Sequence, residues 1–296
     1  MDQKLTCICG DAVDEMSKLP AKSIRLLVTD PPYNLNKNYT VSHDNLKFDE
    51  YINFSRQWLR EAVRVLTDDG SIYIFMGMRY ISYLYIILEQ ELKLNFNSWI
   101  TWFYTQGVGK TKGFSTRHDD ILYFTKHPKN FIFNLDDVRI PQKFYRAVNN
   151  MRGANPGNVW QFSHTHYCNK NRQNHPTQKP EGLFERIILA SSNEGDTVLD
   201  PFVGSGTTLR VCQQLKRNCI GIDINPDYVK MSENRLAEPF TGFDSIDDRM
   251  KRLPSDLGTY RAKYIKNHVD WFLKNHSNEI NNFNEKFCRQ QNLFSE

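Results

Sequence analysis

The stretch Thr197–Thr208, with the sequence TVLDPFVGSGTT, decides the fold of this chain. Its first four residues are predicted to form a short strand, which runs into a turn that contains Gly204 and Gly206. A helix is predicted over 209–215. Glycines let the backbone approach a ligand closely, and the free N–H groups of a helix N-terminus face the same place. The stretch therefore predicts a strand–turn–helix unit that binds a ligand.

The next predicted strand, Cys219–Asp223, indicates which ligand this is. Asp223 follows Gly204 by nineteen residues, where an acidic side chain can bind both hydroxyls of a ribose. The third glycine of the dinucleotide fingerprint would fall at Leu209, so a pyrophosphate is poorly supported and a dehydrogenase is a minor alternative. S-adenosylmethionine, which has a ribose but no phosphate, is the favoured cofactor. A glycine turn that binds no ligand is the other alternative.

A second strand ends in the tetrapeptide Asp30-Pro31-Pro32-Tyr33. Residues 24–30 form a near-continuous apolar run, as expected of a central strand in a parallel sheet, and the two prolines cannot continue a ladder. Open α/β sheets bind ligands at the carboxyl ends of their strands. The tetrapeptide is therefore a candidate for the reactive site, and a structural Pro-Pro turn capped by Asp is the alternative.

The tetrapeptide suits the methylation of an exocyclic amine. The lone pair of such a nitrogen is delocalised into the ring, so two acceptors that grip its hydrogens help it to become nucleophilic. The Asp30 carboxylate and the Pro31 carbonyl can be these acceptors, and Pro32 fixes the direction of that carbonyl. Tyr33 offers a flat face to an extruded base, a contact worth roughly 1–3 kcal/mol.

Between the two motifs, predicted helices and strands alternate. Apolar residues recur at helical spacing over 54–66, and strands are predicted over 71–75 and 99–104. Residues 131–133 are predicted to form a hairpin with residues 121–124. The alternation is typical of an α/β fold, with a twisted, mostly parallel sheet and helices on both faces.

The composition is that of a globular protein. The chain has 296 residues, 40% hydrophobic and 24% charged, which excludes a disordered or fibrous protein. No run approaches the roughly 18 apolar residues of a membrane-spanning helix, so no membrane partner is expected. Six scattered cysteines do not make a disulfide scaffold, which favours a cytoplasmic location.

The net charge of +4 hides a basic segment. Residues 105–180 hold twelve Lys and Arg against four Asp and Glu, so the rest of the chain is slightly acidic. Such an excess indicates a polyanion partner, with a solvated loop region as the alternative. Residues 136–173 show no regular period and are predicted to be an inserted recognition region. The candidates for DNA contact within it are Arg139, Lys143, Arg146 and Arg152.

Together the motifs resemble those of the β-group amino-methyltransferases of DNA, chiefly the adenine-N6 enzymes of restriction-modification systems. The resemblance covers roughly residues 5–236. It rests on DPPY at 30–33, REAVRVLTDDGSIYIF at 60–75, HPTQKPEGLFERIILASSNEGDTVLDPFVGSGTT at 175–208 and GIDINPDY at 221–228. In that family the catalytic motif precedes the cofactor turn, and the target-recognition region lies between them. The same order holds here, and it is permuted relative to most S-adenosylmethionine-dependent methyltransferase folds.

The resemblance implies a role for each matching residue. Asp30, Pro31, Pro32 and Tyr33 match the catalytic motif. Asp223 matches the ribose-binding acid, Asp11 a position near the adenine of the cofactor, and Lys179 a partner for the methionine carboxylate. The residues implied in cofactor binding are Asp11, Asp30, His175, Thr177, Lys179, Asp200, Phe202, Gly204, Ser205, Gly206, Thr207 and Asp223.

The implied activity is transfer of a methyl group from S-adenosylmethionine to the N6 amine of a flipped-out adenine in a specific sequence of double-stranded DNA. Asp at position 30, where Ser is the family's other residue, favours adenine-N6 over cytosine-N4. Cytosine-N4 methylation, methylation of RNA or protein, and a non-catalytic DNA-binding subunit are the alternatives. The resemblance also implies a homodimer and a cognate restriction endonuclease as partners.

The catalytic domain is thus expected in two parts, residues 1–135 and 174–238, around the recognition region at 136–173. Residues 239–296 lie beyond the resemblance and are predicted to form a C-terminal tail, helical where apolar residues share a face over 264–272. The segment Asn34–Asn45 is expected to close over the base. No metal is expected, because the spacing of a zinc site at His164, His166, Cys168 and His175 matches no standard finger.

Overall fold

The computed structural model describes residues 3–36, 44–105, 107, 109–141, 153–164, 172–173, 175–240, 242 and 250–252. The chain divides into two compact units. The first comprises residues 1–134 and 157–247, and the second comprises residues 135–156 and 248–296. Both predicted motifs, at 30–33 and 200–207, belong to the first unit.

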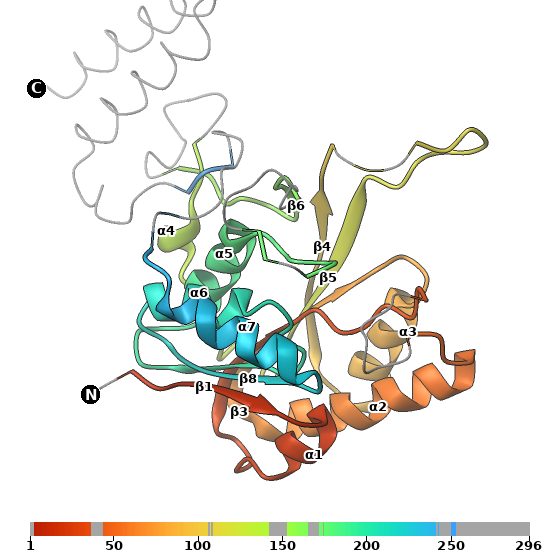
Figure 1. Ribbon diagram of the computed structural model, residues 1–296. Coiled ribbons are helices and arrows are strands. Elements are labelled where there is room, and N and C mark those ends of the chain that lie inside the picture. The colour runs from red at the N-terminus through yellow and green to blue at the C-terminus, as the bar shows by residue number, and fades with distance from the viewer. Residues whose placement is uncertain are drawn as a thin grey trace, which may run out of the picture. The chain divides into compact units, whose positions relative to one another are not determined.

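The first unit is built on one sheet, shown in Figure 1. The strands lie in the order β1-β8-β7-β2-β3-β5-β4-β6. All neighbouring pairs are parallel except the two that β5 makes, so the predicted mostly parallel sheet is confirmed. The described strands are β1 (Leu5–Cys9), β2 (Ile24–Thr29), β3 (Leu66–Met76), β4 (Asn95–Phe103), β5 (His118–Thr125), β6 (Val159–Gln161), β7 (Thr197–Asp200) and β8 (Asn218–Asp223).

β2 lies inside the sheet because it is apolar on both faces. Leu26, Leu27 and Val28 are completely buried, as in a strand that helices cover on both sides. β2 pairs with β7, and the two strands end at Thr29 and Asp200. Because the strands are parallel neighbours, the Asp30 motif and the glycine turn leave the sheet side by side.

Helices cover both faces of the sheet, as predicted (Figure 1). The alternation along β3 shows the two layers. Ile72 and Ile74 pack into the core formed with α1, α2 and α3, whereas Phe75 stacks on Phe184 of α5 with ring centroids 5.2 Å apart. The first layer holds α1 (Ala12–Ser17), α2 (Phe48–Val65), α3 (Ile81–Ile86) and the π-helical turn η1 (Ile87–Glu91), and the second holds α5 (Glu181–Ser191), α6 (Thr207–Gln214) and α7 (Pro226–Ala237). None of the helices in the described ranges has the length and apolar character needed to cross a membrane.

Two expectations about local structure are wrong. Residues 131–133 form no strand, because both edges of β5 are already paired, with β3 and with β4. Residues 159–161 lie in the segment expected to lack regular structure, yet they form β6 and pair with β4. The helical tail predicted over 264–272 lies outside the described residues.

The second unit is described over 135–141, 153–156 and 250–252. It contains α4 (Leu135–Val138) and a β-bridge between Ile140 and Ala154. Arg139 pairs with Asp136 at 2.7 Å and donates a hydrogen bond to the carbonyl of Gly153 at 3.0 Å. The guanidinium of Arg139 thus holds this segment together, and its contact with DNA stays a prediction. The other candidates, Lys143, Arg146 and Arg152, lie outside the described residues.

Candidate active site

The candidate residues gather where β2 and β7 end. Thr29, the last residue of β2, donates a hydrogen bond from Oγ1 to Oδ1 of Asp200, the last residue of β7, at 2.7 Å. These residues are 171 positions apart in the sequence. The bond therefore ties the predicted catalytic motif to the predicted cofactor turn.

Asp30 has one occupied and one open carboxylate oxygen. Oδ2 accepts a hydrogen bond from the ammonium of Lys179, with 2.5 Å between nitrogen and oxygen. Oδ1 is buried and has no hydrogen-bond partner among the described residues. Leaving a buried acceptor unpaired costs about 1–3 kcal/mol, so this oxygen favours a donor from a substrate. In the structure the ammonium of Lys179 binds Asp30, and its contact with the methionine carboxylate stays a prediction.

Tyr51 of α2 holds the backbone of the catalytic motif. Its hydroxyl donates a hydrogen bond to the carbonyl of Pro32 at 2.7 Å, and burial raises the pKa of Tyr51, so the hydroxyl keeps its proton. The ring of Tyr33 packs over Gly77, where a Cβ would lie 3.2 Å from ring carbon Cδ2. Sequence analysis missed Tyr51 and Gly77, because neither stands in a motif that indicates chemistry.

Hydrogen bonds join the two ends of the loop that follows the motif. Asn34 donates a hydrogen bond from Nδ2 to the carbonyl of Leu46 at 2.9 Å and accepts one at Oδ1 from the Leu46 amide at 2.7 Å. Asp44 accepts hydrogen bonds from the amides of Asn34 and Leu35 at 2.6 and 2.9 Å. The segment expected to close over the base is thus anchored at both ends, and residues 37–43 lie outside the described residues.

Both glycines of the cofactor turn are required by geometry. Gly204 has a φ of +49°, and a Cβ there would lie 2.9 Å from Nε2 of His175. Gly206 has a φ of +76°, and a Cβ there would lie 2.7 Å from Oγ of Ser232 on α7. Only glycine adopts such backbone angles without strain. Gly204 therefore shapes the turn on the side of His175, and Gly206 allows α6 to begin close to α7.

Asp223 organises the turn from the end of β8. It accepts hydrogen bonds from the amides of Gly204 and Asn225, both at 2.9 Å. Burial raises the pKa of Asp223, and these two bonds oppose the rise. The amide of Gly10 donates to the backbone carbonyl of Asp223 at 3.0 Å, which places Asp11 beside it. The predicted ribose and adenine contacts thus lie at neighbouring strand ends.

Asp200 is buried beneath the turn. Its carboxylate accepts hydrogen bonds from Oγ1 of Thr29, Oγ1 of Thr208 and the amide of Phe202. Burial raises the pKa of Asp200 to about 7, although these hydrogen bonds lower it. The side chain therefore joins three elements at the floor of the site.

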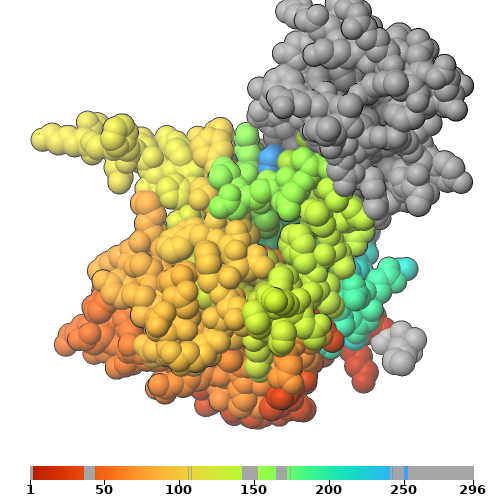
Figure 2. Space-filling view, turned by 180° about the vertical axis from the view of Figure 1, so that it is seen from behind, coloured from red at the N-terminus to blue at the C-terminus, as the bar shows by residue number. Residues whose placement is uncertain are grey.

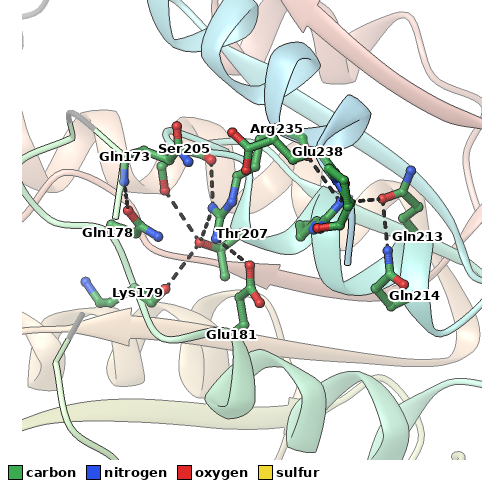
Figure 3. A network of polar contacts seen from close by, with 12 residues as sticks. Gln173, Gln178, Lys179, Glu181, Ser205, Thr207, Gln213, Gln214, Arg235 and Glu238 are labelled. Carbon is green, nitrogen blue, oxygen red and sulfur yellow. Dashed lines mark hydrogen bonds and ion pairs between the residues drawn. The ribbon is translucent and has the colours of Figure 1, made fainter. Parts of the chain in front are cut away.

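A buried network supports the turn from behind, as Figure 3 shows. Arg235 of α7 pairs with Glu181, the first residue of α5, at 2.6 Å, and the two side chains are 2% and 4% exposed. The Arg235 guanidinium also donates to the Ser205 carbonyl at 2.9 Å and to Thr207 Oγ1 at 3.1 Å. Thr207 Oγ1 in turn donates to the backbone carbonyl of Lys179 at 3.2 Å. The network thus fixes the cofactor turn relative to the segment that carries Lys179.

A cavity of about 250 Å³ lies between these elements. Asp11 and Asp223 give it an acidic part, Phe54 and Phe202 give it flat apolar walls, and Lys179 gives it a cation. These groups fit the hydroxyls, the adenine ring and the carboxylate of S-adenosylmethionine. Of the residues predicted to bind the cofactor, Gly206 is the exception, and the others line the cavity: Asp11, Asp30, His175, Thr177, Lys179, Asp200, Phe202, Gly204, Ser205, Thr207 and Asp223.

Part of the cavity wall was not predicted. Phe54 was expected only as part of the apolar face of a helix, yet it lines the cavity next to Phe202, with ring centroids 6.1 Å apart. Asn225 and Tyr228 also line it, and the ring of Tyr228 lies 4.6 Å from that of His175. Both stand in the GIDINPDY stretch, so that motif was the signal that could have identified them.

The two described histidines of the disfavoured zinc site lie in different surroundings. Burial lowers the pKa of His164 and of His175 to about 4, and the charge of Lys179 adds to the effect. His164 packs on Tyr104 and Trp102, whereas His175 packs on Tyr228. The described part of the chain holds no group of three potential metal ligands, and His166 and Cys168 lie outside it.

Comparison with known proteins identifies the family. Residues 24–234 match the family described as DNA methylase. The chain belongs to this family. Residues 183–294 also match the D12 class of N6 adenine-specific DNA methyltransferases.

Individual relatives agree with this assignment. The chain is 64% identical over 285 residues to the type II methyltransferase M.HpaI of Haemophilus parainfluenzae, an alignment that covers 96% of this chain and 90% of M.HpaI. It is 40% identical over 243 residues to the DNA adenine methyltransferase YhdJ of Escherichia coli (strain K12), covering 78% and 82% of the two chains. The M1.HpyAVI–SAM complex shares its fold, with a TM-score of 0.58, 23% identity and coverage of 78% of this chain and 98% of that one.

The main predictions from sequence are therefore confirmed. The chain has the predicted methyltransferase fold and belongs to the predicted class, the S-adenosylmethionine-dependent adenine-N6 DNA methyltransferases. The roles of individual residues stay predictions.

Proposed function

We propose that this methyltransferase acts on an adenine turned out of double-stranded DNA, with the N6 amine held between Asp30 and Pro31. The observation that carries this proposal is the open Oδ1 of Asp30, a buried acceptor on a residue that also lines the cofactor cavity. A base that stays stacked in a duplex cannot bring its amine to a buried atom. The target base therefore has to leave the stack.

Asp30 and Pro31 act on the amine as hydrogen-bond acceptors. Asp30 Oδ1 accepts a hydrogen bond from one amino hydrogen, and the Pro31 carbonyl accepts one from the other. These two bonds draw the nitrogen lone pair out of conjugation with the ring. The next carbonyl, that of Pro32, is already occupied by the Tyr51 hydroxyl. S-adenosylmethionine, when bound, supplies a methyl group on a sulfonium. The charge of Asp30 favours the positive charge that nitrogen gains as the N–C bond forms and the C–S bond breaks.

The rest of the site contributes alignment. An in-line displacement needs its reacting atoms held close together, and such positioning lowers the barrier by several kcal/mol. The Thr29–Asp200 hydrogen bond fixes the catalytic motif against the cofactor turn. Arg235 fixes the turn against the segment that carries Lys179.

The direct test of the catalytic role is nucleoside mass spectrometry after incubation of unmethylated DNA with the enzyme and S-adenosylmethionine. The wild type should yield the deoxy form of N6-methyladenosine. Asp30→Ala should yield at least about 100-fold less, by analogy with other lost transition-state contacts. Cofactor affinity, measured by calorimetry, should change little in that variant. Near-normal activity in Asp30→Ala, or N4-methylcytosine as the product, would overturn the proposal.

The extrusion of the base has its own test. A duplex that carries 2-aminopurine at the target adenine should become strongly fluorescent when the enzyme binds, because the base leaves the quenching stack. The same duplex with the probe several positions away from the target is the control. Equal fluorescence changes at the two positions would contradict extrusion.

The loop between β4 and β5 is proposed to contact DNA. Figures 1 and 2 show it extending away from the sheet. Phe114 in this loop is fully exposed, and Lys110 and Lys112 are exposed as well. Exposed lysines can bind the phosphates of the DNA backbone. Changing either lysine to Ala should therefore weaken binding to all sequences. It should also reduce by about 1 the slope of the logarithm of the binding constant against the logarithm of the salt concentration. Titrations at several salt concentrations would contradict the proposal if the slope did not change.

We also infer a place in a restriction-modification system. The 64% identity to M.HpaI extends over 96% of the chain, so we propose that the two enzymes methylate the same DNA sequence. A cytoplasmic location, a homodimer and a cognate endonuclease complete this proposal. DNA treated first with M.HpaI should then accept no methyl groups from this enzyme, and undiminished incorporation of labelled methyl would contradict a shared sequence.

A further inference from the structure

The ammonium of Lys179 lies in an aromatic enclosure beside Asp30. Its nitrogen is 5.1 Å from the ring centroid of Tyr33, 5.8 Å from that of Phe75 and 5.9 Å from that of Trp102. The residue is 7% exposed. Because water is largely excluded, charges near this ammonium act on one another more strongly than they would at the surface.

A second carboxylate, that of Asp119 on β5, is on the same face of the sheet as two of these rings. Asp119 lies directly opposite Trp102 in the antiparallel pair of β4 and β5, so the two side chains are on one face of the sheet. Phe75 is on that face too, since it lies opposite Ile121, two residues along from Asp119. Within the described ranges, no side chain or amide donates a hydrogen bond to the Asp119 carboxylate.

We propose that Asp119 is a positioning residue for methyl transfer, which offsets the charge of Lys179 so that Asp30 can act on the amine. This inference rests on the proposed role of Asp30. Asp30 and Lys179 together carry no net charge, and such a pair stabilises a developing cation poorly. With Asp119 ionised, the group of three carries a net charge of −1 beside the nitrogen that becomes positive.

The charges around Asp119 agree with this role. Burial raises the pKa of Asp119 above its usual value, Lys179 lowers it, and Asp30 and Asp120 raise it. The other titratable groups that act on it are Tyr104, which directly follows β4, and His118, the preceding residue of β5, which lowers the pKa of Asp119. Burial and Asp119 raise the pKa of Tyr104 to about 12, so that hydroxyl stays neutral. The nearby His164 is neutral as well, since its pKa is about 4.

The pH dependence follows from these groups. A raised pKa means that Asp119 takes up its proton at a higher pH than an exposed aspartate does. Protonation removes the extra negative charge, so kcat should fall as the pH is lowered through the pKa of Asp119. A variant with no ionisable group at this position should lack that part of the acid limb.

The test compares Asp119→Asn with Asp120→Asn. Asp120 is the matched control, because it is the next residue on β5, is 5% exposed and points to the opposite face, where Thr101 donates to it at 3.3 Å. Asp119→Asn should lower kcat about tenfold, change KM for DNA and cofactor less than twofold, and flatten the acid limb of the kcat profile. Asp119→Glu should restore most of kcat. Asp120→Asn should keep the wild-type kcat and an acid limb, with the midpoint of that limb moved to lower pH because the charge of Asp120 raises the pKa of Asp119.

Several outcomes separate this inference from the proposed function. If Asp30→Ala is inactive while Asp119→Asn has the kcat and pH profile of Asp120→Asn, the role of Asp119 is wrong and that of Asp30 stands. If Asp30→Ala is active, the proposed function is wrong. If Asp119→Asn does not fold, Asp119→Glu carries the test, because it keeps the charge and should retain an acid limb with a shifted midpoint. An Asp119→Glu variant without an acid limb would overturn the inference.

Discussion

The two sides of the active site differ in how completely their polar groups are paired. On the cofactor side, comprising residues 200–207 and 223–225 with their supports, Asp200, Asp223 and Glu181 all accept hydrogen bonds from within the chain. On the transfer side, comprising residues 30–33 with Lys179 and Asp119, Asp30 keeps an open buried oxygen. The polar groups of the cofactor side are therefore satisfied within the chain, whereas the transfer side offers an acceptor that fits the proposed contact with the amine of the substrate.

The largest expected effect concerns the support of the cofactor side. Arg235→Met removes the ion-pair partner of the buried Glu181 carboxylate, which should lower the free energy of unfolding by about 3–5 kcal/mol. The double variant with Glu181→Leu should recover most of this loss, because it removes both charges. Urea unfolding of the single and double variants measures both. If the loss of unfolding free energy in the double variant equalled the sum of the losses in the two single variants, the two residues would not act as a pair.

The pH dependence of stability tests the buried Asp200. Its pKa is about 7 in the folded protein, against roughly 3.9 in an unfolded chain, so between these values the folded state binds more protons. The stability from this group is thus complete below about pH 4 and is lost as the pH rises through 7, by at most about 1.4 kcal/mol per unit. Unfolding between pH 5 and 8 should show a shallower decline in Asp200→Asn. Parallel declines in both proteins would contradict the burial of a titrating group.

Gly204→Ala tests whether the turn is preformed for the cofactor. The change forces alanine into a positive φ, a strain of about 1–2 kcal/mol, and brings Cβ within 2.9 Å of His175, so cofactor affinity should fall at least tenfold. Gly113→Ala is the control, since Gly113 also has a positive φ of 86° but has open space around it. Calorimetric titration with S-adenosylmethionine measures both, and equal affinities would contradict the account of the turn.

The smallest expected effect lies on the transfer side. Gly77→Ala places Cβ 3.2 Å from the ring of Tyr33, a contact that a shift of a few tenths of an ångström relieves. The variant should raise KM for DNA by a factor of about two to five, a fraction of the 1–3 kcal/mol that base stacking contributes. Its cofactor affinity should match that of the wild type. A loss of cofactor affinity would show that the two sides are not separable.

Motifs whose chemistry requires certain residue types were predictable from the sequence. The order of strand, glycine turn, helix and acidic strand end located Gly204 and Asp223, and the tetrapeptide located Asp30. Tyr51, Arg235 and Asp119 could not be found in this way, because each acts through a partner that only the fold brings near. Asp119 in particular shares a sheet face with Phe75 and Trp102, two of the rings around Lys179, because β5 lies between β3 and β4, whereas the sequence predicted a hairpin of residues 121–124 with residues 131–133.

The most direct test of the division between the two sides measures cofactor affinity and the single-turnover rate of methyl transfer in Asp30→Asn and Gly204→Ala. The account predicts opposite patterns. Asp30→Asn should bind S-adenosylmethionine within about threefold of wild type and transfer methyl at least about 100-fold more slowly with saturating cofactor and DNA. Gly204→Ala should bind the cofactor at least tenfold more weakly and, once saturated, transfer methyl at close to the wild-type rate. Two variants that lose affinity and rate together would contradict the separation of binding from transfer.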